Sequence, residues 1–457
     1  MTELTAQRVA ELSGGRLIGD GDRTASSIVF NHKELRPGAA FAAVGRGYDF
    51  IAQALADGAP FAIAEKPAEG NVIVVDDTVL ALGRVAKAVR RELDVRVVGI
   101  TGSVGKTLTK DLLAAVLRTK YNVHASPKSY NQELGAPLVV LNCPDDAEVM
   151  VSEMGARHVG DIAYLAEIVQ PHTGIITGIG ITHLEEFGTR EAIARTKSEL
   201  LASLPADGVA IVPSNDDYLE VLAGSTAARV RTVGPGASVS YRALRVDPDG
   251  RTRGVVTVEG RDVDMTLPVA GRALMRNAAL AIACGFEHGV DPADAALAIA
   301  GAPLSSYRME QRRIGGWTVI NDAYNANPTS VSSALRSVKE MGADRPVWAV
   351  LGPMTELGTA EAEGHRRIGR LAADLSYEGV IALDAPGIAE AAGSIARPVT
   401  SANAAADAVV EFVPPGALVL VKASRVVSLE LFPDILQASL DRAPRMRREG
   451  APPKQEP

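Results

Sequence analysis

The sequence predicts an α/β protein with parallel sheets. Short runs of apolar and β-branched residues, such as residues 95–100, alternate with segments of helical periodicity, and this alternation is typical of parallel strands joined by helical crossovers. A glycine-rich turn follows the run at 95–100 and leads into a helical segment. The chain has 457 residues, 47% of them hydrophobic, so roughly two to four domains with cores of their own are expected.

The composition argues against several classes of protein. The net charge is −8 and the charges are scattered, which leaves no electrostatic footprint for nucleic acid. Neither Cys143 nor Cys284 lies in a CxxC motif or a Cys/His cluster, so a disulfide framework and a zinc site are not expected. The sequence has no apolar stretch of about 18 residues and no signal-peptide pattern at its N-terminus. We therefore expect a cytoplasmic protein with small-molecule partners and no membrane span.

The pattern of strand-like and helical segments changes twice along the sequence, which predicts three domains. Residues 1–94 mix short strand-like and helical runs and should form a small α/β domain. Residues 95–306 begin with the buried strand and the glycine turn, and they include an alternating stretch with Asp-Gly turns at 229–269, typical of a small antiparallel excursion. Residues 307–457 contain four buried strand-like runs separated by helices and should form a second parallel α/β domain.

The glycine turn predicts a phosphate loop. Thr-Gly-Ser-Val-Gly-Lys-Thr at 101–107 lies between a strand and a helix, where backbone N–H groups and the helix N-terminus can surround phosphate oxygens. Ile100 stands where the general motif has its first glycine, so the loop is organised as TGxxGKT. Lys106 would reach the outer phosphates and the Thr107 hydroxyl would bind Mg²⁺. The predicted nucleotide contacts here are Gly102, Ser103, Val104, Gly105, Lys106 and Thr107.

Later motifs separate a ligase from a motor or a kinase. They are SYNQELGAPLVVL at 129–141, SEMGARHVGDIAYLAEIVQPHTGIIT at 152–177, THLEEFGT at 182–189, ARTKSELL at 194–201, NDAYNANPTS at 321–330 and LGPMTELG at 351–358. In this order, and with the phosphate loop, they resemble the Mur ligase family. The resemblance is dense from about residue 95 to 360 and thin before it.

The resemblance implies a fold and an activity. The fold would have an N-terminal domain for the UDP-sugar end of an acceptor (1–94), a central ATP-binding domain (95–306) and a C-terminal Rossmann-like domain that brings an amine (307–457). The activity would be ATP- and Mg²⁺-dependent amide formation through an acyl phosphate, with release of ADP, by a monomer. The YNANP string at 324–328 is that of the branch that adds D-alanyl-D-alanine to UDP-N-acetylmuramoyl-tripeptide in peptidoglycan synthesis.

The resemblance also assigns roles to single residues. The expected catalytic residues are Lys106, Lys197, His183 and Arg308. The expected Mg²⁺ ligands are Thr107, Glu153, His183 and Lys197, the last as a carbamate. Asn277, Arg308 and Asp322 should contact the nucleotide, and the expected substrate contacts are Ser129, Tyr130, Asn131, Tyr324, Asn325 and Asn327.

The residues alone allow plainer interpretations of several positions. Glu153 follows a strand at the edge where a Mg²⁺ ligand belongs, but it could be an acidic loop residue. Lys197 could be a solvated helix lysine and His183 a structural histidine. The asparagines could serve helix capping and turns.

The sequence departs from the family mainly in its substrate parts. Phe30-Asn31-His32-Lys33 and Asp49-Phe50-Ile51 stand at segments that serve the UDP-sugar in the family, and Tyr307 replaces a glycine before Arg308. Two ligase hypotheses therefore stay open: the peptidoglycan enzyme with an altered uridine pocket, and a relative that joins a different, non-UDP acid and amine in specialised metabolism. A third is a non-catalytic binding module, which the intact phosphate loop argues against.

Overall fold

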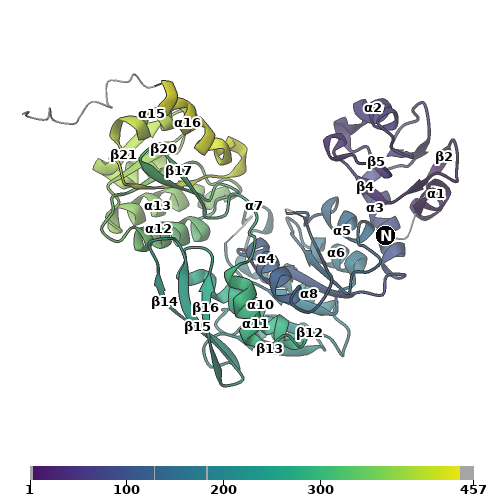
Figure 1. Cartoon of the computed structure of the whole chain (residues 1–457), viewed down its shortest axis with the longest axis horizontal. Coiled ribbons are helices and arrows are strands. Elements are labelled where there is room, and N and C mark those ends of the chain that lie inside the picture. Colours follow the sequence, from purple (N-terminus) through teal and green to yellow (C-terminus); the bar gives the residue numbers. More distant parts are fainter. Residues whose placement is uncertain (1–3, 128, 182–183, 443–457) are drawn as a thin grey trace, which may run out of the picture.

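The computed structural model describes residues 4–127, 129–181 and 184–442. It is an α/β protein with three lobes that follow one another along the chain (Figure 1). We name the lobes by their sheets: the N-terminal lobe has a five-stranded sheet, the central lobe a nine-stranded sheet and the C-terminal lobe a six-stranded sheet. The predicted domain limits at residues 94 and 306 stay predictions.

The N-terminal lobe is small. Its sheet has the order β2-β7-β6-β5-β4, in which only β2 is antiparallel to its neighbour. The strands are β2 (Arg16–Ile18), β4 (Ser27–Val29), β5 (Ala39–Ala42), β6 (Ala62–Ala64) and β7 (Val72–Val74), with a separate pair, β1 (Leu4–Thr5) and β3 (Thr24–Ala25). The helices are α1 (Ala6–Ser13), α2 (Ile51–Ala56) and α3 (Thr78–Arg90), the last of which leads to the central lobe.

The central sheet is parallel around β8 and antiparallel at the end formed by β14, β15 and β16. Its order is β16-β15-β14-β13-β12-β11-β8-β10-β9, and the strands β14, β15 and β16 form the antiparallel excursion that the alternating sequence predicts. The strands are β8 (Arg96–Thr101), β9 (Val123–Ala125), β10 (Val149–Glu153), β11 (Thr173–Ile176), β12 (Val209–Pro213), β13 (Arg229–Val233), β14 (Val239–Val246), β15 (Thr252–Val258) and β16 (Arg261–Leu267).

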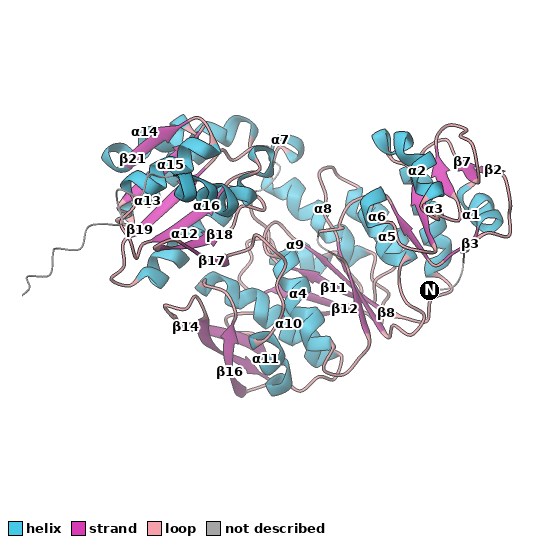
Figure 2. Cartoon of the chain, turned by 45° about the horizontal axis from the view of Figure 1, so that its top comes forward, coloured by secondary structure: helices cyan, strands magenta, loops and turns pink. Residues whose placement is uncertain are grey.

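Helices pack on both faces of the central sheet (Figure 2). They are α4 (Lys106–Leu117), α5 (Gly135–Leu141), α6 (Asp161–Val169), α7 (Leu184–Phe187), α8 (Arg190–Ala202), α9 (Leu219–Gly224), α10 (Met275–Glu287) and α11 (Pro292–Ala300). The short helix α7 lies within the THLEEFGT motif. Its two glutamates, Glu185 and Glu186, occupy the first turn, where negative charge stabilises a helix N-terminus.

The C-terminal sheet has the order β17-β18-β22-β19-β20-β21, and all its strands except β17 are parallel. The strands are β17 (Glu310–Ile314), β18 (Trp317–Asn321), β19 (Val347–Leu351), β20 (Gly379–Leu383), β21 (Ala396–Val399) and β22 (Leu418–Lys422). The helices are α12 (Pro328–Gly342), α13 (Glu361–Asp374), α14 (Pro386–Ala392), α15 (Ala402–Phe412) and α16 (Phe432–Arg442).

Strand β19 shows why helices cover both faces of this sheet. Val347, Ala349 and Leu351 belong to the core that contains α12 and α13, whereas Trp348 and Val350 belong to the core that contains α15 and α16. Successive side chains of a strand point to opposite faces, so an unbroken apolar run needs a cover on each side. Among the described residues, no helix has the length and apolar character needed to cross a bilayer.

Arg90 fixes the end of α3 against the central lobe. Its side chain is buried and donates hydrogen bonds to the carbonyl oxygens of Val169 (2.9 Å), Leu93 (3.1 Å) and Val95 (3.3 Å). A buried carbonyl that loses its donor costs free energy, and a charged donor makes the bond stronger.

We expect Arg90→Ala to lower the free energy of unfolding by about 2–3 kcal/mol, because it leaves these carbonyls without their donor. Urea unfolding followed by circular dichroism measures the change. The neighbouring exposed Arg91, changed to alanine, is the control and should stay within about 0.5 kcal/mol of the parent. A similar value for both variants would contradict the assignment.

Candidate active site

The phosphate loop joins β8 to α4, as the sequence predicts. Gly102 and Gly105 have φ angles of 144° and 89°, in the region that favours glycine. A Cβ atom at Gly102 would lie 2.1 Å from the hydroxyl oxygen of Thr177, and one at Gly105 would lie 2.2 Å from the side-chain nitrogen of Asn277. Both glycines are therefore required by backbone conformation and by close packing.

Lys106 begins α4, and its ammonium group lies over the loop. Its Nζ atom donates to the carbonyl oxygen of Gly102 at 2.8 Å. The pKa of Lys106 is lowered, chiefly because the ammonium lies away from water; Glu153 opposes the shift and Arg308 adds to it. An anion beside this ammonium would relieve the cost of its burial.

The predicted metal ligands Thr107 and Glu153 are both buried. The Thr107 hydroxyl accepts a hydrogen bond from Nη2 of Arg308 at 2.8 Å. The Glu153 carboxylate accepts one from the side-chain nitrogen of Asn131 at 2.7 Å through Oε1, while Oε2 is buried without a partner in the described part of the chain. A buried carboxylate oxygen without a donor is costly, so this position suits a cation.

Lys197 is not a solvated helix lysine. Helix α8 turns it inward, where its side chain is 2% exposed and its Nζ lies 6.0 Å from the ring centroid of Phe187. Burial lowers the pKa of Lys197 to about 7, and the charge of Lys106 adds to the shift while Asp161 and Glu199 oppose it. His183, predicted to lie beside it, is outside the described residues.

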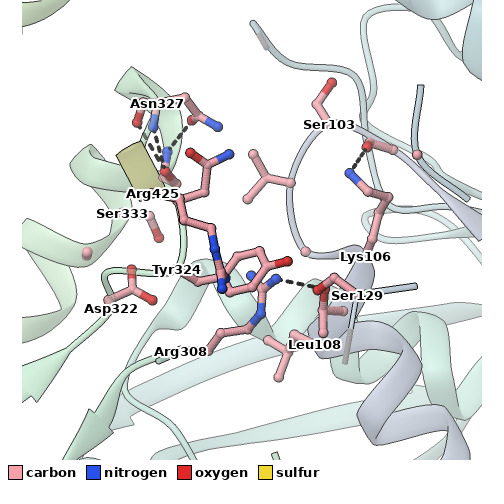
Figure 3. A pocket seen from close by; sticks show the side chains of 18 of the residues that line it. Ser103, Lys106, Leu108, Ser129, Arg308, Asp322, Tyr324, Asn327, Ser333 and Arg425 are labelled. Carbon is pink, nitrogen blue, oxygen red and sulfur yellow. Dashed lines mark hydrogen bonds between the residues drawn. The ribbon is translucent and has the colours of Figure 1, made fainter. Parts of the chain in front are cut away.

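Arg308 lies where the chain passes to the C-terminal lobe. The residues on either side, Tyr307 and Met309, have φ angles of 63° and 57°, which are uncommon for residues other than glycine. The Arg308 guanidinium carbon lies 4.3 Å from the ring centroid of Tyr324, and that of Arg425 lies 5.1 Å from the same centroid. Figure 3 shows Arg308, Tyr324 and Arg425 together beside the phosphate loop.

An ion pair between a buried lysine and a partly buried aspartate holds the loop that contains Tyr324. The Asp322 carboxylate pairs with the Lys422 ammonium and accepts the backbone N–H of Met309 at 3.2 Å. Lys422 also donates to the carbonyl oxygens of Asp322 and Asn325, each at 3.0 Å. Asp322 therefore orders the start of the C-terminal lobe, and its predicted contact with the nucleotide stays a prediction.

Two of the asparagines predicted to contact ligands, Asn277 and Asn327, stabilise the fold. Asn327 caps α12 through a capping box with Ser330, which is the plainer interpretation of this position. Asn277 is buried and donates to the Thr109 hydroxyl at 2.9 Å and to the Gly105 carbonyl oxygen at 3.3 Å, so its side chain braces the phosphate loop. The contact of Asn277 with the nucleotide stays a prediction.

Tyr130 faces the N-terminal lobe. Its ring centroid lies 5.6 Å from that of Phe30, and its hydroxyl donates to Glu34 at 3.3 Å. Burial, with the Glu34 charge, raises the pKa of Tyr130 to about 12. Its neighbours Ser129 and Asn131 instead face the phosphate loop and Glu153.

A cavity of about 440 Å³ collects most of the predicted residues between the central and C-terminal lobes. Those that line it are Gly102, Ser103, Val104, Gly105, Lys106, Thr107, Ser129, Asn131, Glu153, Lys197, Arg308, Asp322, Tyr324, Asn325 and Asn327. Tyr130 and Asn277 do not line it. The lining residues that sequence reasoning missed include Arg157, Ser333, Glu356, Lys422 and Arg425.

The missed residues had a usable signal in four cases. Arg157 and Glu356 lie inside the quoted motifs at 152–177 and 351–358, and Lys422 and Arg425 begin and end a Lys-Ala-Ser-Arg segment. Ser333 is one of several polar residues on α12, and nothing in its local sequence distinguishes it. In the described part of the chain, no group of three or more His, Cys, Asp or Glu residues is placed to hold a metal ion.

We expect Gly105→Ala to weaken ADP binding by at least about tenfold, because the added Cβ meets the Asn277 side chain and distorts the loop. Isothermal titration calorimetry measures the affinity. Gly236→Ala is a matched control, since Gly236 also has a positive φ (77°) but no atom within 4 Å of an added Cβ. Unchanged ADP affinity in Gly105→Ala would show that the loop does not need this close contact.

Comparison with known proteins finds family models that match the parts of the chain that line the cavity. Models of the Mur ligase middle domain and of the Mur ligase glutamate ligase domain match residues 100–285 and 307–425. A relative from Mycobacterium tuberculosis, named UDP-N-acetylmuramoyl-tripeptide–D-alanyl-D-alanine ligase, is 35% identical over 96% of this chain and 98% of its own length.

Two solved structures extend the likeness to the fold. An Acinetobacter baumannii structure, named as a UDP-N-acetylmuramoylalanyl-D-glutamyl-2,6-diaminopimelate–D-alanyl-D-alanyl ligase, has a TM-score of 0.83 and 27% identity, and covers 96% of this chain and 99% of its own. The MurF ligase of Thermotoga maritima in complex with ADP has a TM-score of 0.78 and 28% identity, and covers 91% of this chain and 98% of its own. The chain belongs to the Mur ligase family.

Proposed function

We propose that this chain joins D-alanyl-D-alanine to UDP-N-acetylmuramoyl-tripeptide, forming an amide through an acyl phosphate at the expense of ATP. The observation that carries the proposal is the shared cavity, in which the phosphate loop, Glu153 and Lys197 of the central lobe face the Tyr324 loop of the C-terminal lobe. The full-length likeness to a ligase of that name supports the choice of substrates. No observation favours a different acid or a non-catalytic module.

The first step needs charge neutralisation. The acceptor carboxylate attacks the γ-phosphorus of ATP, a P–O bond forms, and ADP leaves. Lys106 and Arg308 supply two positive charges at the end of the cavity that holds the loop, and both are fixed by contacts of 2.8 Å to neighbouring oxygens. Positioned cations away from water stabilise charge that develops on phosphoryl oxygens.

The residues present fit Mg²⁺. Thr107 offers a hydroxyl oxygen, Glu153 offers a buried oxygen without a partner in the described part of the chain, and both line the cavity. We propose that these two residues hold Mg²⁺, together with His183 from outside the described residues. A bound Mg²⁺ would neutralise phosphate charge in this chemistry.

Lys197 suits carbamylation. A lysine with a pKa of about 7 has a large neutral fraction at neutral pH, and only the neutral amine attacks CO₂. A new N–C bond forms and a proton leaves to water, so a buried cation becomes a buried anion. We propose that this anion faces the metal and Lys106, whose positive charge would offset its burial.

The second step needs the amine of the dipeptide on the C-terminal side of the cavity. We propose that Tyr324 and Asn325 face it, while Ser129 and Asn131 face the acceptor. The neutral amine nitrogen attacks the acyl carbon, and the C–N bond forms as the bond between the acyl carbon and the phosphate oxygen breaks. The nitrogen loses its proton to the departing phosphate. No side-chain nucleophile is required, because the acyl phosphate is already activated, and the enclosing lobes keep water from it.

The N-terminal lobe suits the uridine end of the acceptor. The rings of His32 and Phe50 stack with centroids 4.0 Å apart and an interplanar angle of 9°, and the Phe50 side chain is 38% exposed. Flat aromatic faces that remain exposed can stack on a base. We propose that His32 and Phe50, together with Phe30, replace the uridine-binding residues usual in the family.

The proposed function predicts a UDP-linked pentapeptide. UDP-N-acetylmuramoyl-tripeptide, D-alanyl-D-alanine, ATP and Mg²⁺ should give this product and one phosphate per bond, measured by mass spectrometry and phosphate release. Release of phosphate should stop when Mg²⁺ is chelated. Absence of the product, with ADP still bound, would move the proposal to another acid and amine.

Carbamylation predicts a pH-dependent need for CO₂. Because the neutral amine is the reactive form, activity should fall as the pH drops below about 7, and added bicarbonate should restore part of it. Lys197→Ala should lower kcat by at least about 100-fold. Arg195→Ala, an exposed change on the same helix, is the control, and an equal bicarbonate response in Lys197→Ala would refute the role.

A further inference from the structure

A buried histidine supports one of the loops that face the cavity. His365 lies in the first half of α13, its side chain is 7% exposed, and it does not line the cavity. The Nε2 atom of its ring accepts the backbone N–H of Met354 at 2.8 Å. Met354 belongs to the β19 loop (residues 352–357), which follows β19 and lines the cavity through Thr355 and Glu356. His365 has no part in the two steps described above.

The hydrogen bonds of the His365 ring fix its tautomer. A ring nitrogen that accepts a hydrogen bond carries no proton, so the proton of the neutral ring lies on Nδ1. The ring is also hydrogen-bonded to the backbone of Glu361, one helical turn earlier, and a donor at Nδ1 fits that bond. The ring therefore connects helix α13 to the β19 loop, and only its neutral form has an acceptor for Met354.

The surroundings of the ring favour this neutral form. Burial lowers the pKa of His365, while the charge of Glu361 and the hydrogen bond to its backbone oppose the shift. The loop brings the uncharged amide of Met354 to the ring, and α14 packs on His365 through Gly387. Among the described residues, Glu361 is thus the charged side chain that acts on this pKa.

The β19 loop is joined to the second loop on the same side of the cavity. Thr355 donates its N–H to the Ser424 hydroxyl at 3.0 Å. That hydroxyl donates to the carbonyl oxygen of Ala326, in the Tyr324 loop, at 3.4 Å. Hydrogen bonds therefore run from His365 through the β19 loop to the loop that contains Tyr324.

Helix α13 also supports both loops by packing. A Cβ atom at Gly364 would lie 3.2 Å from the side chain of Leu357 and 3.2 Å from the ring of Pro328. Leu357 ends the β19 loop, and Pro328 begins α12 directly after the Tyr324 loop. The absence of a side chain at Gly364 thus lets the helix approach the two loops at the position next to His365.

The β19 loop needs this support because part of it is strained. Glu356 has a φ of 64°, which is sparsely populated for residues other than glycine and persists only where the surroundings determine it. Its Oε1 atom lies 3.8 Å from Nη2 of Arg157 in the central lobe. Without the bond from Met354 to His365, the strained backbone would relax, and the part of the cavity wall that it forms would move with it.

We propose that His365 is a positioning residue for the amine substrate, because its neutral ring holds the β19 loop, and through it the Tyr324 loop, in the arrangement that receives the dipeptide. The inference rests on the proposed function, which places the dipeptide on the C-terminal side of the cavity. Protonation of Nε2 would turn the acceptor into a donor that faces the N–H of Met354. The contact is therefore present above the pKa of the ring and is lost as the pH falls through it.

Two substitutions separate the hydrogen bond from the imidazole itself. Glutamine places an amide oxygen near the position of Nε2 and does not titrate, so His365→Gln should keep the KM for D-alanyl-D-alanine at pH 7 within about threefold of the wild type. His365→Ala leaves the buried N–H of Met354 without its acceptor. It should raise that KM by about 10- to 100-fold, with little change in the KM for the acceptor.

The pH dependence is the readout that a purely structural role would not change. With saturating bicarbonate, the KM of the wild type for D-alanyl-D-alanine should rise relative to that of His365→Gln as the pH falls from 7 to about 5. Ionisation of the dipeptide amine is common to both proteins and cancels in this ratio. Hydrogen exchange followed by mass spectrometry should be faster in the β19 loop of His365→Ala than in the other two proteins.

A second histidine provides the control. His172 also accepts a backbone N–H, that of Val97 at 3.1 Å, but this bond lies near the amino end of β8, away from the phosphate loop. His172→Ala should leave the KM for the dipeptide and the exchange of the β19 loop unchanged.

Three results would overturn the inference. They are an equal pH dependence in the wild type and His365→Gln, an equal rise of both KM values in His365→Ala, and unchanged exchange of the β19 loop in His365→Ala. Absence of product from the wild type would instead refute the proposed function, and the role of His365 towards the dipeptide with it. The exchange experiment distinguishes the two failures, because it tests the support of the loop without any turnover.

Discussion

The parallel register around β8 is the constraint on which the site depends. Because β10 and β11 both run parallel to β8, the carboxyl ends of three strands meet at one edge, where Thr101, Glu153 and Thr177 lie. The phosphate loop leaves from this edge and packs on Thr177 so closely that no side chain fits at Gly102. The positions of the phosphate loop and of Glu153, the proposed metal ligand, are thus consequences of one pairing pattern.

A second sheet completes the site from the other side. Its strands β18 and β22 are also parallel neighbours, and their carboxyl ends bring Asp322 and Lys422 together as an ion pair. That pair orders the loop of Tyr324, whose ring centroid lies 4.3 Å from the guanidinium carbon of Arg308 and 5.1 Å from that of Arg425. Cations gather here although the whole chain carries a net charge of −8. The anion-binding character is therefore local to the cavity.

The sequence was sufficient for the features that depend on local pattern. The phosphate loop, the edge position of Glu153, the antiparallel excursion and the α/β class all follow from spacing and periodicity. The features that depend on packing between distant segments were out of reach. Lys197 shows its burial only once α8 is placed, and Tyr130 faces Glu34, 96 positions away in the chain.

The pairing of Arg157 with Glu356 illustrates the same limit more strongly. The two residues are far apart in the sequence and belong to different lobes, so no local pattern relates them. Asn277 and Asn327 pose a different difficulty. Both are noticeable in the sequence, but an asparagine can cap a helix or brace a loop as well as bind a ligand, so the sequence does not decide between these roles. Only the geometry of α10 and α12 shows that their amides serve the loop and the helix end.

The hydrogen bond from Arg308 to the Thr107 hydroxyl connects the start of the C-terminal lobe to the phosphate-loop helix of the central lobe. The same oxygen is the proposed metal ligand, and a metal cation that takes it repels the guanidinium of like charge. Arg308 lies between Tyr307 and Met309, whose positive φ angles are sparsely populated for residues other than glycine. A displacement of the Arg308 side chain therefore acts on a backbone segment that is already strained. A metal ion that binds Thr107 would therefore act directly on the joint between the central and C-terminal lobes.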